Sequence, residues 1–84
     1  MSKNINNDIM KYFSYNISYL RRKHSISKKK MCEILGIGVS SLNKIEQGIL
    51  PPRLNVEVLF RIQSYFGVPA SVQVSERIGK QYDL

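Results

Sequence analysis

The chain has 84 residues, which is enough to close one hydrophobic core and too few for a second domain. Apolar residues make up 43% of it, so the composition excludes a disordered tail and predicts a folded protein. Thirteen Lys and Arg against six Asp and Glu leave a net charge of +7, which favours a polyanionic partner. We expect one domain over residues 1–84, with its core in residues 9–68 and a tail at 69–84.

The number of cysteines and the distribution of apolar residues predict where in the cell the protein is found. Cys32 is the single cysteine, so no internal disulfide can form and the fold must rest on packing, as in a reducing cytoplasm. Residues 1–9 are polar and lack the apolar segment of a secretory signal. No segment approaches the roughly 18 apolar residues of a membrane span. We therefore expect a soluble cytoplasmic protein, associated with the nucleoid if its partner is DNA.

The cations are clustered rather than spread along the chain. Six of the thirteen fall within residues 21–30, namely Arg21, Arg22, Lys23, Lys28, Lys29 and Lys30. Such clustering is typical of a surface that binds phosphates. An anionic membrane is the competing partner, but membrane binding needs large apolar residues exposed beside the cations, and here those are needed for a core. We favour nucleic acid.

Apolar spacings of three and four predict three helices in the first half of the chain, at about residues 7–23, 28–35 and 39–47. Ser27 is a good N-cap for the second, and the glycines in residues 36–38 end it and form a tight turn. The residues expected in the core from these helices are Ile9, Met10, Phe13, Ile17, Leu20, Met31, Ile34, Leu35, Leu42 and Ile45.

A fourth helix follows a proline-containing loop at residues 49–53, begins after Asn55 as its N-cap and ends at Phe66. Beyond it, Pro69 fits the first turn of a fifth helix, while apolar residues in 68–74 alternate with period two, as in a strand. We favour the helix and predict an all-α fold of four to five helices. The fourth helix should bury Val58, Leu59, Ile62, Tyr65 and Phe66.

The second and third helices, joined by a short glycine-containing turn, fit the description of a helix-turn-helix between Ser27 and Gly48. Small polar residues and a lysine share the outer face of the third helix: Ser40, Asn43, Lys44 and Gln47. A helix fits the major groove of B-DNA, where such side chains reach base edges and phosphates. This face is the candidate binding site.

Residues 28–30 are all lysines, and they occupy the first turn of the second expected helix, where cations are least favourable. The positive end of the helix dipole and their mutual repulsion disfavour cations there by a few tenths of a kcal/mol each. A phosphate at this position would meet both the ammonium groups and the unpaired N–H groups of the first turn. The alternative is a solvated charged face, and we favour the phosphate.

Several motifs follow one another in a fixed order between residues 17 and 68. They are Ile17-x-x-Leu20-Arg21, Ile26-Ser27, Met31-Cys32, Gly36-Ile37, Ile45-Glu46-Gln47-Gly48, Pro52, Leu59-x-x-Ile62 and Phe66-Gly67-Val68. In this order and spacing they resemble the lambda-repressor-like, Cro-type (XRE) helix-turn-helix family of bacteria and phages. The resemblance implies a compact all-α domain that binds double-stranded DNA and regulates transcription.

The resemblance also implies roles for individual residues. Base contacts fall to Val39, Ser40, Asn43 and Lys44, of which Val39 can meet a thymine methyl. Contacts to the DNA backbone fall to Ser27, Lys28, Lys29, Gln47 and Arg53. A structural ion pair is expected between Arg21 and Glu46.

The chain departs from the family pattern at several places, one of which is Gly38, where a capping Ser or Thr is usual. Lys28 stands where glutamine is usual, which makes the phosphate contact more electrostatic. Ile49 and Leu50 replace the cations often found after the third helix, so they are expected to be exposed and to be available to a protein partner. The tail at 69–84 matches poorly, although a dimer contact often lies there.

Two function classes remain open. The first is a repressor-like regulator that binds a pseudo-palindromic operator as a homodimer, with half-sites about 34 Å apart. The second is a protein-binding module such as an antitoxin or anti-regulator. An enzyme is not expected, because six carboxylates, one His and one Cys form no recognisable catalytic or metal-binding set, and no cofactor motif is present. Cys32 should be a buried structural thiol.

Overall fold

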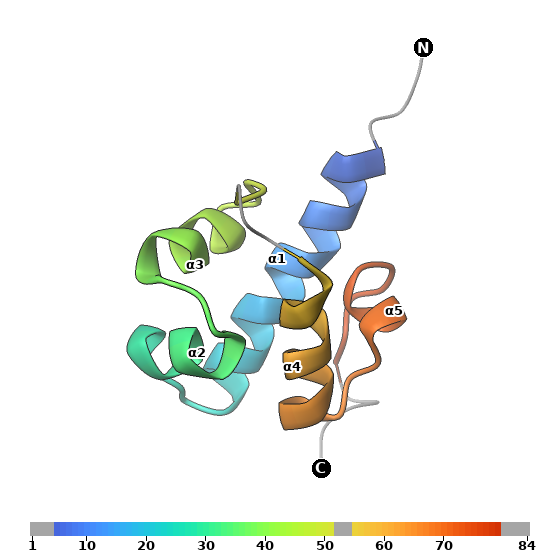
Figure 1. Ribbon diagram of the computed structural model, residues 1–84. Coiled ribbons are helices and arrows are strands. Elements are labelled where there is room, and N and C mark those ends of the chain that lie inside the picture. Colours follow the sequence, from blue (N-terminus) through green and yellow to red (C-terminus); the bar gives the residue numbers. More distant parts are fainter. Residues whose placement is uncertain (1–4, 52–54, 80–84) are drawn as a thin grey trace.

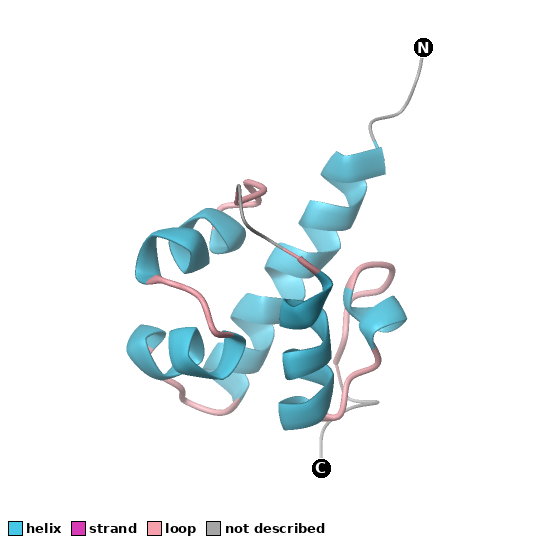
Figure 2. Ribbon diagram, in the orientation of Figure 1, coloured by secondary structure: helices cyan, strands magenta, loops and turns pink. Residues whose placement is uncertain are grey.

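The computed structural model describes residues 5–51 and 55–79, and Figure 1 shows their arrangement. The elements are α1 (Ile5–Lys23), α2 (Lys28–Leu35), α3 (Val39–Glu46), α4 (Val56–Phe66) and α5 (Ala70–Gln73). Within the described residues all regular structure is helical, as Figure 2 shows. The all-α prediction is confirmed, and the segment that was ambiguous between helix and strand forms the short helix α5.

Local capping groups explain where the helices begin and end. Ser27 Oγ accepts a hydrogen bond from the Lys30 N–H at 3.1 Å and starts α2, and Asn55 Oδ1 accepts from the Glu57 N–H at 3.0 Å and starts α4. Gly67 ends α4 with a φ of 77°, a left-handed conformation that glycine adopts without steric cost. These boundaries follow from local chemistry, and the sequence predicted them to within two residues.

Helices α1 and α4 join the helix-turn-helix to the C-terminal part of the described chain. Helix α1 contacts α3 and α5, while α4 contacts α2 and α5. In Figure 1, α2 and α3 lie on one side of α4 and α5 lies on the other. None of the helices in residues 5–51 and 55–79 is both long and apolar enough to span a lipid bilayer.

One continuous core joins all the helices. Its buried apolar residues are Met10, Phe13, Ile17, Leu20, Met31, Cys32, Ile34, Leu35, Leu42, Ile45, Val58, Ile62, Val68 and Ile78. The core prediction is therefore confirmed for most of its members, while Ile9, Leu59 and Phe66 are half-buried.

The prediction that Tyr65 is buried is wrong. Its side chain is 57% exposed and packs edge-on against Phe66, with ring centroids 4.8 Å apart. Helical spacing alone placed it wrongly, because spacing does not show how far neighbouring elements cover a helix.

Two buried amides hold the segment after α4 against the rest of the fold. Asn16 of α1 donates from Nδ2 to the carbonyls of Gln73 (2.7 Å) and Glu76 (2.8 Å), and its Oδ1 accepts from the Ile78 N–H at 2.9 Å. The Gln73 side chain donates to the carbonyls of Leu59 and Val68. Because buried backbone groups need partners, these amides supply hydrogen bonds to backbone groups of α4, α5 and the irregular segments on either side of α5.

Candidate nucleic-acid interface

Helix α3 is oriented by its apolar side. Leu42 and Ile45 are fully buried, which leaves the opposite side of the helix at the surface. Val39 is 50% exposed there, Ser40 and Gln47 are exposed, and the half-buried side chains are Asn43 and Lys44. The four residues predicted to contact bases, Val39, Ser40, Asn43 and Lys44, all lie on or at the edge of this accessible face.

The turn between α2 and α3 depends on Gly36. Its φ of 73° is left-handed, and both its N–H and that of Ile37 donate to the Cys32 carbonyl, at 2.8 and 3.0 Å. A Cβ at this position would also lie 3.0 Å from the guanidinium of Arg61 on α4. Backbone conformation and packing therefore both favour glycine at this turn.

The N-terminus of α2 is strongly cationic. Lys28, Lys29 and Lys30 are exposed, and no acidic residue occupies the first turn. Lys30 lies 3.9 Å from Glu33, an exposed pair that contributes little stability. The predicted backbone contacts Lys28 and Lys29 are thus accessible, as is Ser27, whose oxygen already caps the helix.

A hydrogen bond joins this cationic end to the outer face of α3. Lys28 Nζ donates to Asn43 Oδ1 at 2.8 Å, across 15 residues of sequence. It brings a residue predicted to contact phosphate beside one predicted to contact a base. Sequence patterns did not reveal the contact, because it depends on the angle between two helices rather than on spacing within one.

Arg21 and Glu46 anchor the end of α3 to α1. The guanidinium pairs with the carboxylate through two hydrogen bonds, Nε to Oε2 at 2.7 Å and Nη2 to Oε1 at 3.3 Å. Both side chains are mostly shielded from solvent, with 24% and 14% of their surface exposed. Ser14 on α1 also donates to the Glu46 carbonyl at 3.1 Å. This bidentate pair is the ion pair that the family resemblance implies, and it supports α3 rather than facing solvent.

Comparison with known proteins decides the family. A helix-turn-helix family model matches residues 17–73, more than half of the chain. The chain belongs to the Cro-type helix-turn-helix family. Comparison with curated proteins and with solved structures gave no significant match. The match runs from within α1 to the end of α5 and so covers the helix-turn-helix and α4.

Membership of this helix-turn-helix family supports a general activity. The protein is a sequence-specific DNA-binding regulator of transcription. Of the predicted contact residues, Arg53 lies outside the described residues. The other predicted contacts lie between Ser27 and Gln47, on α2 and α3 or directly beside them.

Cys32 lies inside the helix-turn-helix. It is 7% exposed, and burial raises the pKa of its thiol, with the carboxylates of Glu46 and Glu33 adding to the rise and Lys28 opposing it. The thiol therefore stays protonated at neutral pH, which agrees with a packing role rather than a reactive one.

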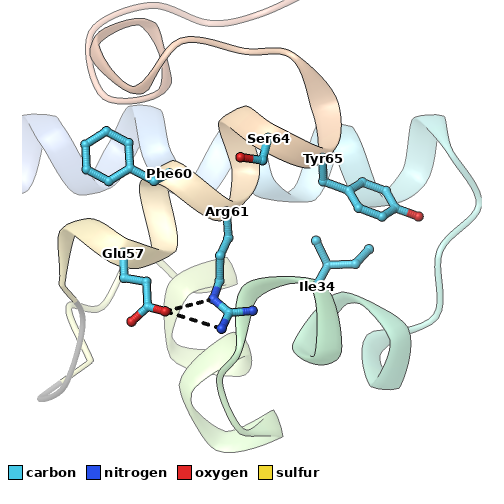
Figure 3. Close-up of a pocket in the computed structure, with 6 residues that line it drawn as sticks. All are labelled: Ile34, Glu57, Phe60, Arg61, Ser64 and Tyr65. Atoms are coloured by element: carbon cyan, nitrogen blue, oxygen red, sulfur yellow. Dashed lines mark hydrogen bonds and ion pairs between the residues drawn. The ribbon is translucent and has the colours of Figure 1, made fainter.

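The outer face of α4 is a second surface with a different character. Val56, Phe60 and Tyr65 are 65%, 56% and 57% exposed, and Arg61 pairs with Glu57 at 3.3 Å. Figure 3 shows these two charges between Phe60 and Tyr65, which lie at opposite ends of a shallow pocket that Ile34 of α2 also lines. We call these five α4 residues the outer α4 face. It presents apolar surface and a balanced charge pair, unlike the cationic start of α2.

Proposed function

We propose that the protein is a repressor that binds a pseudo-palindromic operator as a homodimer, with α3 in the major groove. The observation that carries this proposal is the contact between Lys28 and Asn43, because it unites the cationic start of α2 with the exposed polar face of α3. A duplex offers the matching arrangement, in which a phosphate strand borders a groove lined with base edges. Repression needs only that the bound dimer block a promoter.

The proposed contacts divide by chemistry. Val39, Ser40, Asn43 and Lys44 face the bases, where hydroxyl, amide and ammonium groups can recognise base edges. Ser27, Lys28, Lys29 and Gln47, together with Arg53, face the sugar–phosphate backbone. The lysines and the first N–H groups of α2 both attract a phosphate. This binding needs no catalytic residue, metal or cofactor. A protein that binds DNA in this way is expected in the cytoplasm, at the nucleoid.

The outer α4 face supports the proposed homodimer. A twofold interface must be complementary to itself, and in a chain with a net charge of +7 a neutral, apolar contact surface adds least to the repulsion between two copies. Phe60 and Tyr65 supply apolar area. With two α4 helices antiparallel across the axis, Glu57 of each copy can face Arg61 of the other. We therefore place the dimer contact on α4, and not on the tail at 69–84.

A protein-binding role is the second candidate, and a specific feature favours it. Ile49 and Leu50 are 49% and 54% exposed, as expected for this loop. Leu50 also borders an apolar pocket, whose other lining residues are Ile9, Met10, Phe13, Asn55, Val56, Leu59 and Val74. A partner that inserts an apolar side chain there would make the protein an antitoxin or anti-regulator. This role and DNA binding use separate surfaces and are compatible.

Selection of bound sequences from a random duplex pool tests DNA recognition. The proposal expects an enriched palindrome, and Ser40→Ala should relax the preference at one position of each half-site. If no sequence is enriched at any salt concentration, the operator proposal is wrong and the protein-binding role takes its place.

Sedimentation of the free protein and of its complex tests the dimer. Phe60→Glu on the outer α4 face should give monomers, whereas the matched exposed substitution Ser71→Glu on α5 should leave the dimer intact. The reverse result, with monomers only from Ser71→Glu, would move the dimer contact to the tail.

A further inference from the structure

We propose that the apolar pocket beside Leu50 binds a small molecule with an apolar body and a carboxylate group. The pocket lies between the N-terminal half of α1 and the start of α4. None of the described residues that line it is predicted to contact DNA, so the inference does not rest on operator binding. The alternative occupant is the apolar side chain of a protein partner.

The exposure of the lining residues shows which of them form the floor of the pocket and which form its rim. Met10 and Phe13 are buried and form the floor, whereas Leu50 and Val56 are more than half exposed and form the rim. The pocket is more enclosed than the shallow one beside Phe60. Apolar side chains that stand in water favour an apolar group that covers them.

The volume of the pocket, about 470 Å³, indicates the size of the occupant. A cavity of about 150 Å³ is enough for one benzene ring. A single side chain inserted by a protein partner would therefore leave most of this pocket unfilled. Pockets that bind small molecules range from about 300 to 1,000 Å³ and combine apolar walls with a few polar groups. A molecule two to three times the size of benzene matches the volume best.

Asn55 supplies the polar group of the pocket. Its Oδ1 accepts a hydrogen bond from the Glu57 N–H at 3.0 Å, and because a backbone N–H only donates, this contact fixes the orientation of the amide. Within residues 5–51 and 55–79, Nδ2 of Asn55 makes no hydrogen bond. Both of its N–H groups are therefore available to an acceptor on a ligand.

The net charge of the chain decides between an acceptor and a donor. Oδ1 of Asn55 keeps a second lone pair, so the amide by itself could also accept a hydrogen bond from a ligand. A chain with a net charge of +7 attracts an anion and repels an ammonium group. A carboxylate satisfies both conditions, because it is an anion and only accepts hydrogen bonds.

Membership of the helix-turn-helix family does not account for the pocket. Four of its eight described lining residues lie outside the matched residues 17–73, namely Ile9, Met10, Phe13 and Val74. The floor comes from the part of α1 that precedes the match. The proposed site is therefore built partly from segments that the family model does not cover.

The experiment adds decanoate to the full chain without DNA. Octanoate serves as the shorter homologue and decylammonium as the cationic counterpart. NMR follows the methyl signals of Leu50, Leu59 and Val74, which line the pocket. Ile34, which lines the shallow pocket beside Phe60, provides the reference signal.

Two variants that carry the same change of charge complete the experiment. Asn55→Asp keeps an oxygen that caps α4 but removes the Nδ2 donor. Gln63→Glu is the matched control, because it adds the same charge at an exposed position of α4 that does not line the pocket. It also keeps an oxygen that can accept from the Ala70 N–H.

The wild type should bind decanoate saturably, with shifts confined to the methyl groups of the pocket. Octanoate should bind about 15-fold more weakly, because two fewer methylene groups are buried. Asn55→Asp should weaken decanoate binding about tenfold, since the carboxylate loses its donor and meets a like charge. This variant should prefer decylammonium, whereas Gln63→Glu should stay within about twofold of the wild type.

Three results would overturn the inference. Shifts that never saturate, or that affect Ile34 as strongly as the pocket, would mean adsorption at high concentration only. Equal decanoate affinity in the wild type and Asn55→Asp would refute the role of the amide. Pocket signals that do not respond would leave the pocket to a protein partner. Selection of bound duplexes tests operator binding separately, so that proposal can fail or stand whatever decanoate does.

Discussion

The segment after α5 and the outer face of α3 are each organised around an asparagine, and the fold uses the two side chains differently. Asn16 is 1% exposed, and both ends of its amide are bonded to backbone groups of Gln73, Glu76 and Ile78. Asn43 is half-buried and makes one hydrogen bond among the described residues, to Lys28. The comparison teaches that an amide with all its partners inside the fold stabilises it, whereas one with unused donors at the surface is available for recognition.

The N-terminal ends of α2 and α4 differ in a similar way, one suited to stability and the other to binding. Both α2 and α4 begin with a side-chain cap, but the first turn of α4 contains Glu57 and that of α2 contains only lysines. A carboxylate there is favoured by the helix dipole and a cation is not. Local stability is therefore reduced on the side of the molecule that is proposed to bind phosphate, and it is retained on the other.

Asn16→Ala should have the largest effect on stability. It removes the partners of two buried or part-buried carbonyls and one buried N–H, and we expect a loss of about 3 kcal/mol. Urea unfolding followed by circular dichroism measures it. A loss below about 1 kcal/mol, the net value of a single ordinary hydrogen bond, would show that the contact is not holding the segment after α5.

Asn43→Ala should show the opposite behaviour. Its free energy of unfolding should change by less than about 0.5 kcal/mol, since the lost hydrogen bond is exposed. Affinity for the selected operator should fall about tenfold, as expected for one base contact. Fluorescence anisotropy with operator and with unrelated DNA separates the loss of specificity from any general loss. Equal losses on both duplexes would contradict base recognition.

Removing the two caps compares the helix starts directly. Ser27→Ala and Asn55→Ala should each cost about 1 kcal/mol, because each leaves one N–H of a first turn without its partner. Operator affinity should fall only for Ser27→Ala, since the start of α2 is proposed to face phosphate. The same loss of affinity from Asn55→Ala would show that the backbone contact is not confined to α2.

The smallest effect concerns Cys32. Because burial raises the pKa of the folded-state thiol, the folded protein keeps its proton at pH values where the unfolded chain has lost it. Stability from this group is complete below the ordinary thiol pKa of 9.0 and declines as the pH rises above it. The free energy of unfolding measured from pH 7 to 10 should therefore decline more steeply in the wild type than in Cys32→Ala. Parallel curves would contradict the assignment.

The sequence predicted those parts of the structure that local rules determine. Ser27, Asn55, Gly36 and Gly67 mark helix ends through chemistry within a few residues, so the boundaries of α2 and α4 were predictable. The apolar spacing identified most of the core for the same reason. Tyr65 was placed wrongly, because spacing identifies the apolar stripe of a helix and not how much of that stripe its neighbours cover.

The missed features join residues far apart in the sequence. Asn16 reaches Ile78 across 62 residues, and polar side chains in an amphipathic helix are normally assigned to the surface. Ile78 itself follows α5 and belongs to no helix, so no periodicity indicated that it is 1% exposed. The Lys28 contact with Asn43 likewise depends on how α2 and α3 are angled. The family resemblance implied the two residues separately and not their hydrogen bond.

The most direct test of the contrast between the two asparagines follows both side-chain amides in one NMR spectrum while the selected operator is added. The account predicts that the Nδ2 signals of Asn43 shift and become protected from exchange with water. Those of Asn16, already buried and bonded, should be protected from the start and should not move. An Asn43 signal that is unaffected by operator, while the protein is otherwise bound, would contradict the claim that the outer face of α3 reads DNA.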